Sequence, residues 1–210
     1  MNYKDTINLP KTPFSMKARL DVLEPTMQQK WDEMGLYQMV REARSGCEKY
    51  ILHDGPPYPT GDLHIGTGLN KVLKDFVVRF ETMRGRDAPF VPGWDCHGLP
   101  IEVLVLEELG EKRESTPTAE LRRRCRAYAL KYVEKQRKQF KSLGVSGDWD
   151  EPYLTLRPEY EAGVLEVFAE LVGGGFISRD LKPVHWCYPA APCSPRRSSN
   201  TPTSRARAST

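Results

Sequence analysis

The chain contains 210 residues, of which 39% are hydrophobic, and its 31 lysines and arginines and 28 aspartates and glutamates give a net charge of +3. The length suffices for one compact domain, or for one domain and part of another, and the apolar content excludes a fully disordered chain. The longest aliphatic run, residues 103–106, is far shorter than the roughly 20 residues that a membrane-spanning helix needs.

The first part of the chain, residues 1–46, predicts an extended arm followed by one amphipathic helix. Prolines come first in this part, and apolar residues at helical spacing follow them. Residues 49–54 are rich in side chains that favour β-structure, and they stop at a Gly-Pro-Pro sequence that continues neither strand nor helix. We therefore expect a buried strand that ends in a rigid loop.

A helix and a second strand are predicted next. Between residues 67 and 84, apolar side chains recur at the i, i+3, i+4, i+7 spacing of an amphipathic helix, which Gly85 would end. Residues 88–92 predict a strand that breaks at a glycine. Strand, loop, helix and strand form a βαβ unit, which implies an α/β fold with a parallel sheet. Ligands bind beyond the carboxyl ends of such strands, where the loops at 55–61 and 92–98 would meet.

Two more helices and a tail complete the prediction. One helix opens at Thr118, a candidate N-cap, and runs to about residue 143. The other covers about residues 158–172, and three successive glycines close it. Residues 187–210 contain four arginines, no acidic residue and, beyond the first two positions, no large apolar side chain. Such a segment buries too little surface to offset its ordering entropy, so we expect a disordered tail.

The amino-terminal sequence and the cysteines indicate the compartment. Residues 1–5 lack the apolar segment of a secretory signal. The cysteines lack the spacing of a small disulfide-stabilised domain. We therefore expect a cytoplasmic protein with reduced thiols and no membrane contact. The cysteines are Cys47, Cys96, Cys125, Cys187 and Cys193.

The first loop, residues 54–67, reads Asp-Gly-Pro-Pro-Tyr-Pro-Thr-Gly-Asp-Leu-His-Ile-Gly-Thr and places a histidine and glycines at a strand-to-helix turn. A helix N-terminus offers unpaired N–H groups and partial positive charge to a phosphate. Gly66 would let a nucleotide approach the backbone, and His64 could donate a hydrogen bond to a phosphate oxygen. The alternative is that His64 caps the helix and the glycines only make the turn. A P-loop is excluded, because Thr67 stands where that motif needs lysine.

A second cluster, residues 91–102, follows the second predicted strand. Its Asp95 stands where a carboxylate could face the ammonium group of a ligand, and the alternative is a turn-forming or helix-capping aspartate. Cys96 and His97 are adjacent, so their side chains point apart on an extended backbone. Because no second Cys/His pair follows at ligand spacing, we expect no metal site.

Together the two clusters closely resemble the class I aminoacyl-tRNA synthetases, and within them the isoleucyl branch. Leucyl enzymes tend to have Gly-Trp-Asp-Ala-Phe-Gly-Leu-Pro in the second cluster, and valyl enzymes Pro-Gly-x-Asp-His-Ala-Gly. This chain has Gly-Trp-Asp-Cys-His-Gly-Leu-Pro, which favours isoleucine. The resemblance covers about residues 1–188. The matching segments are 54–58, 64–66, 69–75, 92–102, 143–149 and 182–187.

The resemblance implies a fold and an activity. The fold would be α/β: the first half of a Rossmann-like catalytic domain at 47–181, after the arm and helix, then the start of an editing insertion at 182–188 and the tail at 189–210. The activity would be that of an isoleucine–tRNA ligase. Isoleucine would be activated with ATP and Mg²⁺ to the aminoacyl-adenylate, and then transferred to tRNA(Ile). A full-length member would be a monomer, without protein-bound metal in this part.

The resemblance also assigns residues to roles. Pro56, through its carbonyl, and Asp95, through its carboxylate, would hold the α-ammonium group of isoleucine or its adenylate, with Gly55 beside them. Electrostatic stabilisation of an in-line attack on the α-phosphate would supply the rate, with His64 and Thr67 as catalytic residues. ATP would be bound by Pro57, Tyr58, Gly61, His64, Gly66 and Thr67.

Two features depart from the family pattern. The first signature is normally His-Ile-Gly-His, and its fourth position here is Thr67, which has one short donor and no positive charge. Loss of one transition-state donor lowers a rate by about 10²–10³. The second half of the catalytic domain, with its Lys-Met-Ser-Lys-Ser loop, is not in this sequence. We therefore expect a truncated and inactive or impaired piece; the alternative is a non-catalytic module that binds ATP or an adenylate.

The residues after 188 also depart from the family. Residues 189–201 can be encoded by DNA that, read two bases later, gives Arg-Arg-Thr-Val-Leu-Ala-Glu-Ala-Glu-Leu-Glu-Tyr, close to the usual family continuation. The tail would then be an out-of-frame reading or a sequencing error, which resequencing tests. A third hypothesis is nucleic-acid binding by the tail arginines, sensitive to salt and blind to sequence.

Overall fold

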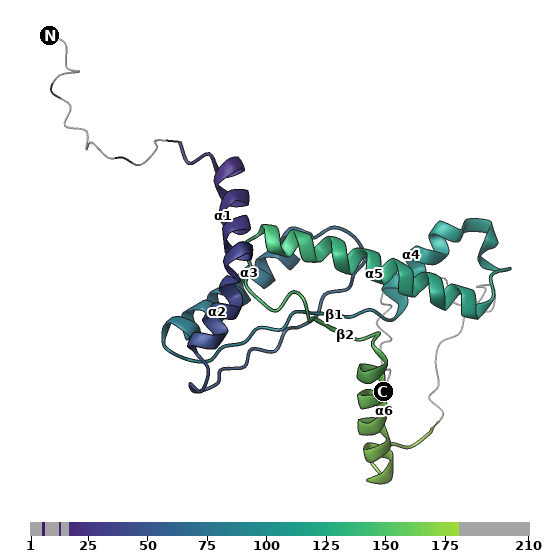
Figure 1. The fold of residues 1–210 in the computed structure, drawn as a ribbon. Helices are drawn as coiled ribbons and strands as arrows, with labels where there is room; N and C mark the ends of the chain where they lie inside the picture. The colour runs from purple at the N-terminus through teal and green to yellow at the C-terminus, as the bar shows by residue number, and fades with distance from the viewer. Residues whose placement is uncertain (1–5, 7–12, 14–16, 181–210) are drawn as a thin grey trace, which may run out of the picture.

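The computed structural model describes residues 6, 13 and 17–180 (Figure 1). Most of the predicted arm, the predicted start of the editing insertion and the predicted tail therefore lie outside the described residues. The described elements are α1 (Leu20–Met34), α2 (Leu36–Ala43), α3 (Ile65–Met83), β1 (Gly93–Trp94), α4 (Leu99–Leu109), the 3₁₀-helix η2 (Gly110–Arg113), α5 (Thr118–Ser142), β2 (Tyr153–Leu154) and α6 (Pro158–Gly173).

Three parallel segments form the centre of the fold. β1 pairs in parallel with β2, with Gly93 opposite Tyr153. On its other side, β1 continues a segment that runs parallel to residues 48–57. Lys49 forms a parallel bridge with Asp87, and eight residues further along each segment the Asp95 N–H donates to the Pro57 carbonyl over 3.0 Å. The predicted α/β fold with a parallel sheet is thus confirmed.

The predicted extent of the strands is wrong. Of residues 88–92, two are prolines, which have no N–H to give to a ladder, so regular pairing begins only at Gly93. Residues 49–54 form a single bridge rather than a strand, and they are tied to β1 by the carboxylate of Asp54, which accepts the Gly93 N–H over 3.1 Å. β2 was not predicted, because two residues are too short for a period-2 pattern.

The amino-terminal helix predicted as one element is two. α1 and α2 meet at Gly35, whose φ of 61° and ψ of 40° are left-handed and end a right-handed helix. The Gly35 N–H donates to the Asp32 carbonyl over 3.1 Å, closing α1. α1 is held against the end of α5, where the Gln28 amide donates to the Ser142 carbonyl over 2.8 Å.

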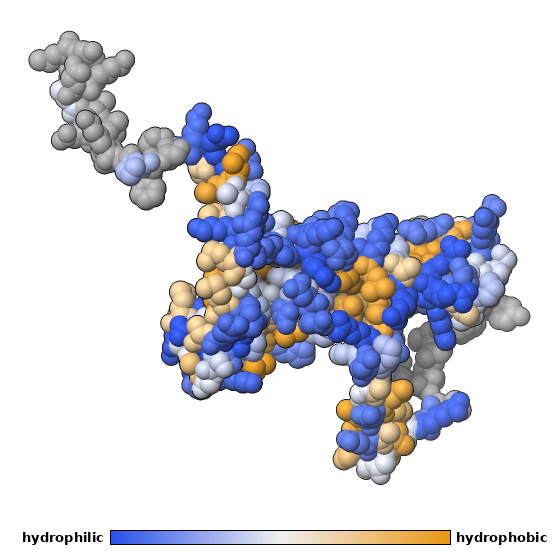
Figure 2. Space-filling model, in the orientation of Figure 1, coloured by the Kyte–Doolittle hydropathy of each residue, from blue (hydrophilic) through white to orange (hydrophobic). Residues whose placement is uncertain are grey.

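The later helices agree with the prediction, with two exceptions. α5 and α6 are confirmed, but Thr118 is the first residue of α5 and not its N-cap; Pro117 takes that position and no side chain caps it. α4 was not predicted, although Pro100 in its first turn is a common helix start. Nearly all of α6 is exposed, and Figure 2 shows apolar side chains on its surface.

Helix α3 forms where it was predicted, but its mainly charged face is buried and most of its apolar face is exposed. An amphipathic helix ordinarily buries its apolar stripe. In α3 the buried positions are Lys71, Asp75, Val78 and Glu81, three of which are ionisable. These charges tolerate burial because each has an opposite charge beside it. Most of the large apolar side chains of α3 are exposed, whereas Val72 is partly buried against the core. The exposed ones are Ile65, Leu69, Leu73, Phe76, Val77, Phe80 and Met83.

The hydrophobic core lies under β1 and beside α4 and α5. Phe140 stacks on Trp149 with ring centroids 5.9 Å apart, and Trp94 lies 6.3 Å and 6.2 Å from these two rings. Trp94 and Phe140 are fully buried. This aromatic cluster fixes the strand that leads directly to Asp95. In the described part of the chain no helix is long and apolar enough to cross a membrane.

Candidate active site

The structure brings the two predicted loops together at one edge of the sheet. The Asp95 N–H donates to the Pro57 carbonyl over 3.0 Å, and the Gly93 N–H donates to Asp54 Oδ2 over 3.1 Å. Both loops leave the carboxyl ends of neighbouring parallel segments. The prediction that the loops at 55–61 and 92–98 meet is therefore confirmed.

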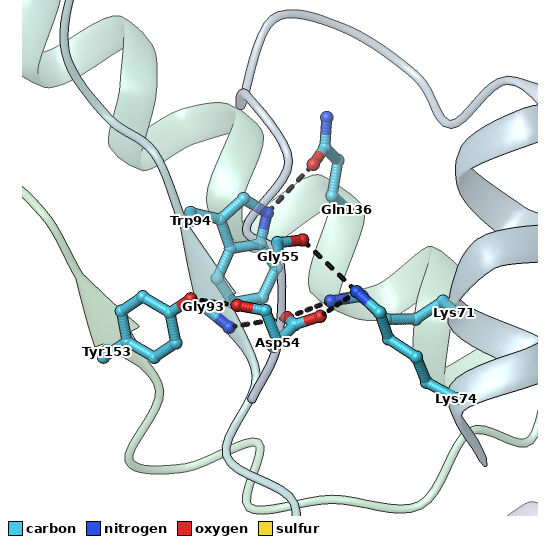
Figure 3. Close-up of polar contacts among 8 residues, drawn as sticks. All are labelled: Asp54, Gly55, Lys71, Lys74, Gly93, Trp94, Gln136 and Tyr153. Carbon is cyan, nitrogen blue, oxygen red and sulfur yellow. Dashed lines mark hydrogen bonds and ion pairs between the residues drawn. The ribbon is translucent and has the colours of Figure 1, made fainter. Parts of the chain in front are cut away.

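Asp54, predicted only as the end of a strand, is the centre of a buried ion network (Figure 3). Its side chain is fully buried; Oδ2 pairs with Lys71, and Oδ1 accepts from Lys74 Nζ over 2.7 Å. Lys74 Nζ also lies 3.4 Å from the Gly55 carbonyl. Burial lowers the pKa of Lys71, and the Asp54 carboxylate opposes that shift. The network fixes the point at which loop 55–61 leaves the sheet.

Gln136 of α5 also holds this loop, and its role was not predicted. Its Nε2 donates to the carbonyls of Tyr58, over 3.2 Å, and Gly61, over 2.9 Å. Its Oε1 accepts the indole N–H of Trp94 over 2.9 Å (Figure 3). One buried amide thus contacts both candidate loops.

His64 is the N-cap of α3. Its Nδ1 accepts from the N–H groups of Gly66, over 3.1 Å, and Thr67, over 3.3 Å. A neutral ring that accepts at Nδ1 carries its hydrogen on Nε2, which donates to the Thr67 hydroxyl over 2.9 Å. Helix capping, the alternative considered for His64, is what its side chain does in this structure.

The neighbouring His64 ring favours glycine at position 66. A Cβ at this position would lie 3.0 Å from His64 Cε1 and 3.1 Å from His64 Nδ1, so a larger residue would require the ring to shift by a few tenths of an ångström. Close approach of a nucleotide to Gly66 stays a prediction.

Asp95 has no cationic partner among residues 17–180. Its Oδ1 lies 3.4 Å from the His97 N–H, a long contact within the turn. The side chain is half-buried, and it lies beside the loop that begins with Gly55 and Pro56. The carboxylate is therefore placed to receive a positive charge from outside the protein.

The other predicted residues lie along loop 55–61. The Pro57 carbonyl accepts from the Asp95 N–H, whereas Tyr58 is 46% exposed and its carbonyl accepts from Gln136. The Gly61 carbonyl also accepts a hydrogen bond from Gln136. The backbone of this loop is thus held by the protein; the Tyr58 side chain is exposed, whereas Pro59 is fully buried.

Cys96 and His97 point to different partners, as expected for neighbours on an extended chain. Cys96 is buried, with Sγ 3.6 Å from the Trp94 carbonyl, whereas His97 is exposed, with Nε2 3.0 Å from Glu161. Burial raises the pKa of Cys96 to about 11. Across residues 6, 13 and 17–180, no three His, Cys, Asp or Glu side chains are placed to share a metal ion.

We expect Cys96 to resist alkylation in the folded protein. A pKa of about 11 leaves roughly one thiol in a thousand as the reactive thiolate at pH 8. Exposed Cys47 should react with iodoacetamide much faster, as measured by mass spectrometry of peptides from a labelling time course. Labelling in urea is the control, in which the two should react alike. Equal rates in the folded protein would contradict the expectation.

Gly93 is required by the ring of Tyr153 on the neighbouring strand. A Cβ on Gly93 would lie 2.0 Å from Tyr153 Cζ, and the Tyr153 hydroxyl is anchored to the Asp54 carbonyl over 2.6 Å. Gly93→Ala should therefore lower the free energy of unfolding by about 1–3 kcal/mol, measured by urea titration.

Gly163→Ala is the matched control, because nothing lies within 4 Å of its added Cβ and alanine favours a helix interior. No loss of stability is expected there. A Gly93→Ala variant as stable as Gly163→Ala would show that Tyr153 moves aside freely.

The fold and the site together define an α/β protein with two loops at the carboxyl edge of a parallel sheet. One loop leads into a capped helix, and the other carries a carboxylate that has no cationic partner among the described residues. The family profile described as "tRNA synthetases class I (I, L, M and V)" matches residues 26–193. The chain belongs to the class I tRNA synthetases.

The chain is similar to isoleucine–tRNA ligases. The isoleucine–tRNA ligase of Brachyspira hyodysenteriae is 57% identical over 187 residues, and that of Caldanaerobacter subterraneus subsp. tengcongensis is 58% identical. In both cases the match covers 89% of this chain and 20% of the relative, so the chain spans about one fifth of their length.

A solved structure supports the fold. The ternary complex of Agrobacterium radiobacter K84 agnB2 LeuRS with tRNA and LeuAMS is similar over 78% of this chain and 19% of its own, with a TM-score of 0.60 and 25% identity. The predicted resemblance to class I synthetases is therefore confirmed.

Proposed function

We propose that this chain carries the isoleucine and ATP subsites of an isoleucine–tRNA ligase. The observation that supports the proposal best is the junction of the two loops, in which Asp95 bonds to Pro57 across neighbouring parallel segments. The unpaired Asp95 carboxylate and the Pro56 carbonyl would bind the α-ammonium group, beside Gly55. A cation bound to a carboxylate makes a charge-assisted hydrogen bond, the stronger kind.

ATP, with Mg²⁺ as part of the substrate complex, would lie along loop 55–61 and over the N-terminus of α3. The N–H groups of Gly66 and Thr67 now donate to His64 Nδ1, and they are the groups that a phosphate would take. His64 would then turn away from the cap and donate to the phosphate. The residues proposed for ATP are Pro57, Tyr58, Gly61, His64, Gly66 and Thr67.

In the full-length ligase, the isoleucine carboxylate would attack the α-phosphorus of ATP. The bond from this phosphorus to the bridging oxygen breaks and pyrophosphate leaves, after which the aminoacyl group passes to tRNA(Ile) with release of AMP. Positioning and electrostatic stabilisation supply the rate in such a reaction. Residues 47–181 would be the first half of the catalytic domain and 182–188 the start of the editing insertion. We propose a cytoplasmic location and a monomeric full-length protein.

For the chain by itself we propose binding with absent or impaired activation. This part of the proposal rests on Thr67, whose hydroxyl accepts a hydrogen bond from His64 where the family pattern has a second imidazole. The chain would therefore bind an isoleucyl-adenylate, and any exchange of pyrophosphate into ATP would be slowed by about 10²–10³ through this position alone.

Calorimetric titration of the 210-residue chain with a non-hydrolysable isoleucyl-adenylate analogue tests this function. Asp95→Asn should weaken binding by about 10- to 100-fold, the value of a charge-assisted hydrogen bond. Asp32→Asn is the matched control, since Asp32 is exposed and pairs with Lys141 outside both loops of the proposed site. An analogue that does not bind, or that binds the Asp95→Asn variant as tightly as the original chain, would refute the proposal.

A further inference from the structure

Gln136 links the two loops of the proposed site from a helix that contributes none of the predicted site residues. Its amide donates to the carbonyls of Tyr58 and Gly61 and accepts from the Trp94 indole, with all three distances between 2.9 and 3.2 Å. Both N–H groups are used, and only 3% of the residue is exposed. Water therefore does not replace these bonds easily, because a buried amide without partners is unfavourable.

The three partners of this amide belong to different subsites. Tyr58 and Gly61 lie in the loop proposed for ATP, whereas Trp94 directly precedes Asp95, the residue proposed for the ammonium group. Trp94 is fully buried and packs against two other aromatic rings of the core. A shift of the loop carbonyls would therefore act through Gln136 on the strand that aims Asp95.

We infer that Gln136 is a positioning residue that couples the two subsites, so that isoleucine and ATP each raise the affinity for the other. This inference rests on the proposed function. Coupling between two sites is reciprocal, and it commonly amounts to about 5- to 150-fold in affinity. Without the amide, each ligand would order only its own loop.

Gln139, one turn further along α5, provides a matched comparison. Its Oε1 accepts the Leu63 N–H over 3.1 Å, and its Nε2 donates to Asp62 Oδ1 over 2.7 Å. Gln139 therefore holds the end of the same loop without contacting Trp94. Loss of Gln139 should loosen the loop and leave the coupling intact.

The coupling can be measured on the 210-residue chain with ATP and L-isoleucinol, which keeps the ammonium group and lacks the reacting carboxylate. The quantity is the ratio of the ATP dissociation constants without and with isoleucinol, obtained by calorimetry. We expect at least about a 5-fold ratio for the original chain, a ratio near 1 for Gln136→Met, and weaker ATP binding with an unchanged ratio for Gln139→Met.

A spectroscopic signal separates coupling from general loosening. In ¹H–¹⁵N spectra, assigned with Trp94→Phe, ATP alone should shift the Trp94 indole N–H in the original chain and in Gln139→Met, but not in Gln136→Met. If Gln136→Met fails to fold, Gln136→Asn replaces it, because its amide is one methylene too short to reach both loops.

The outcomes separate the two proposals. If the original chain binds both ligands and Gln136→Met retains the ratio and the indole shift, the coupling role is wrong and the proposed function stands. A ratio near 1 in the original chain also overturns the coupling role alone. If the original chain binds neither ligand, the proposed function fails and the coupling role fails with it.

Discussion

Replacing Asp54 with asparagine should lower the free energy of unfolding by about 3–5 kcal/mol, a large share of the stability of a domain of this size. The substitution removes the counter-charge of Lys71, whose side chain is 2% exposed, and weakens the hold on Lys74. A buried ammonium group without a carboxylate must stay charged at a high desolvation cost or lose its proton. Urea titration followed by circular dichroism measures the change.

Asp62→Asn is the control for this experiment. Asp62 also pairs with a lysine, Lys135, at 2.8 Å, but the two side chains are 60% and 48% exposed. Exposed pairs contribute less than about 1 kcal/mol. Equal effects of Asp54→Asn and Asp62→Asn would show that the Asp54 network does not stabilise the fold.

Thr67→His should raise the rate of adenylate formation by about 10²–10³ when residues 1–188 replace the matching part of a full-length relative. The imidazole would add a second donor for the phosphates, and it would remove the hydroxyl that now accepts from His64 Nε2. Isoleucine-dependent exchange of pyrophosphate into ATP measures the rate of the chimeric ligase.

Thr67→Val separates these two effects of the histidine. Valine removes the hydroxyl and supplies no donor, so the rate should stay at the level of the threonine chimera. A histidine chimera no faster than the threonine chimera would show that the second imidazole is not needed. A valine chimera as fast as the histidine one would assign the defect to the hydroxyl of Thr67.

The sequence predicted helices α3, α5 and α6 and the meeting of the loops, because these follow from local patterns, but it missed α4 and β2. Gly85 ends α3 with a φ of 93°, and the apolar spacing located the helix correctly. The apolar spacing could not predict which face of α3 is buried. Its orientation depends on Lys71 meeting Asp54, which lies 17 residues earlier in the chain, and periodicity carries no information about such pairs.

The sequence predicted the two loops of the site but not the residues that hold these loops in place. Gln136 lies on α5, a helix rich in lysine and arginine, where a glutamine looks like one more solvent-exposed residue. Only the fold shows that this position faces the loops. His64 was predicted with two roles, and the structure shows its cap, since Nδ1 and the two N–H groups lie within three residues of one another.

In most helices the face that stabilises the fold is also the apolar face. In α3 these are two different faces. The inner face carries the paired charges that we expect to stabilise the fold, whereas the outer face, with Phe76 61% and Met83 75% exposed, meets the solvent. Sulfate strengthens the attraction between apolar surfaces while it screens exposed charges. The chain should therefore leave solution early in ammonium sulfate while it remains folded. Precipitation of this protein then reports on the exposed apolar side chains of α3 and α6 and not on its stability.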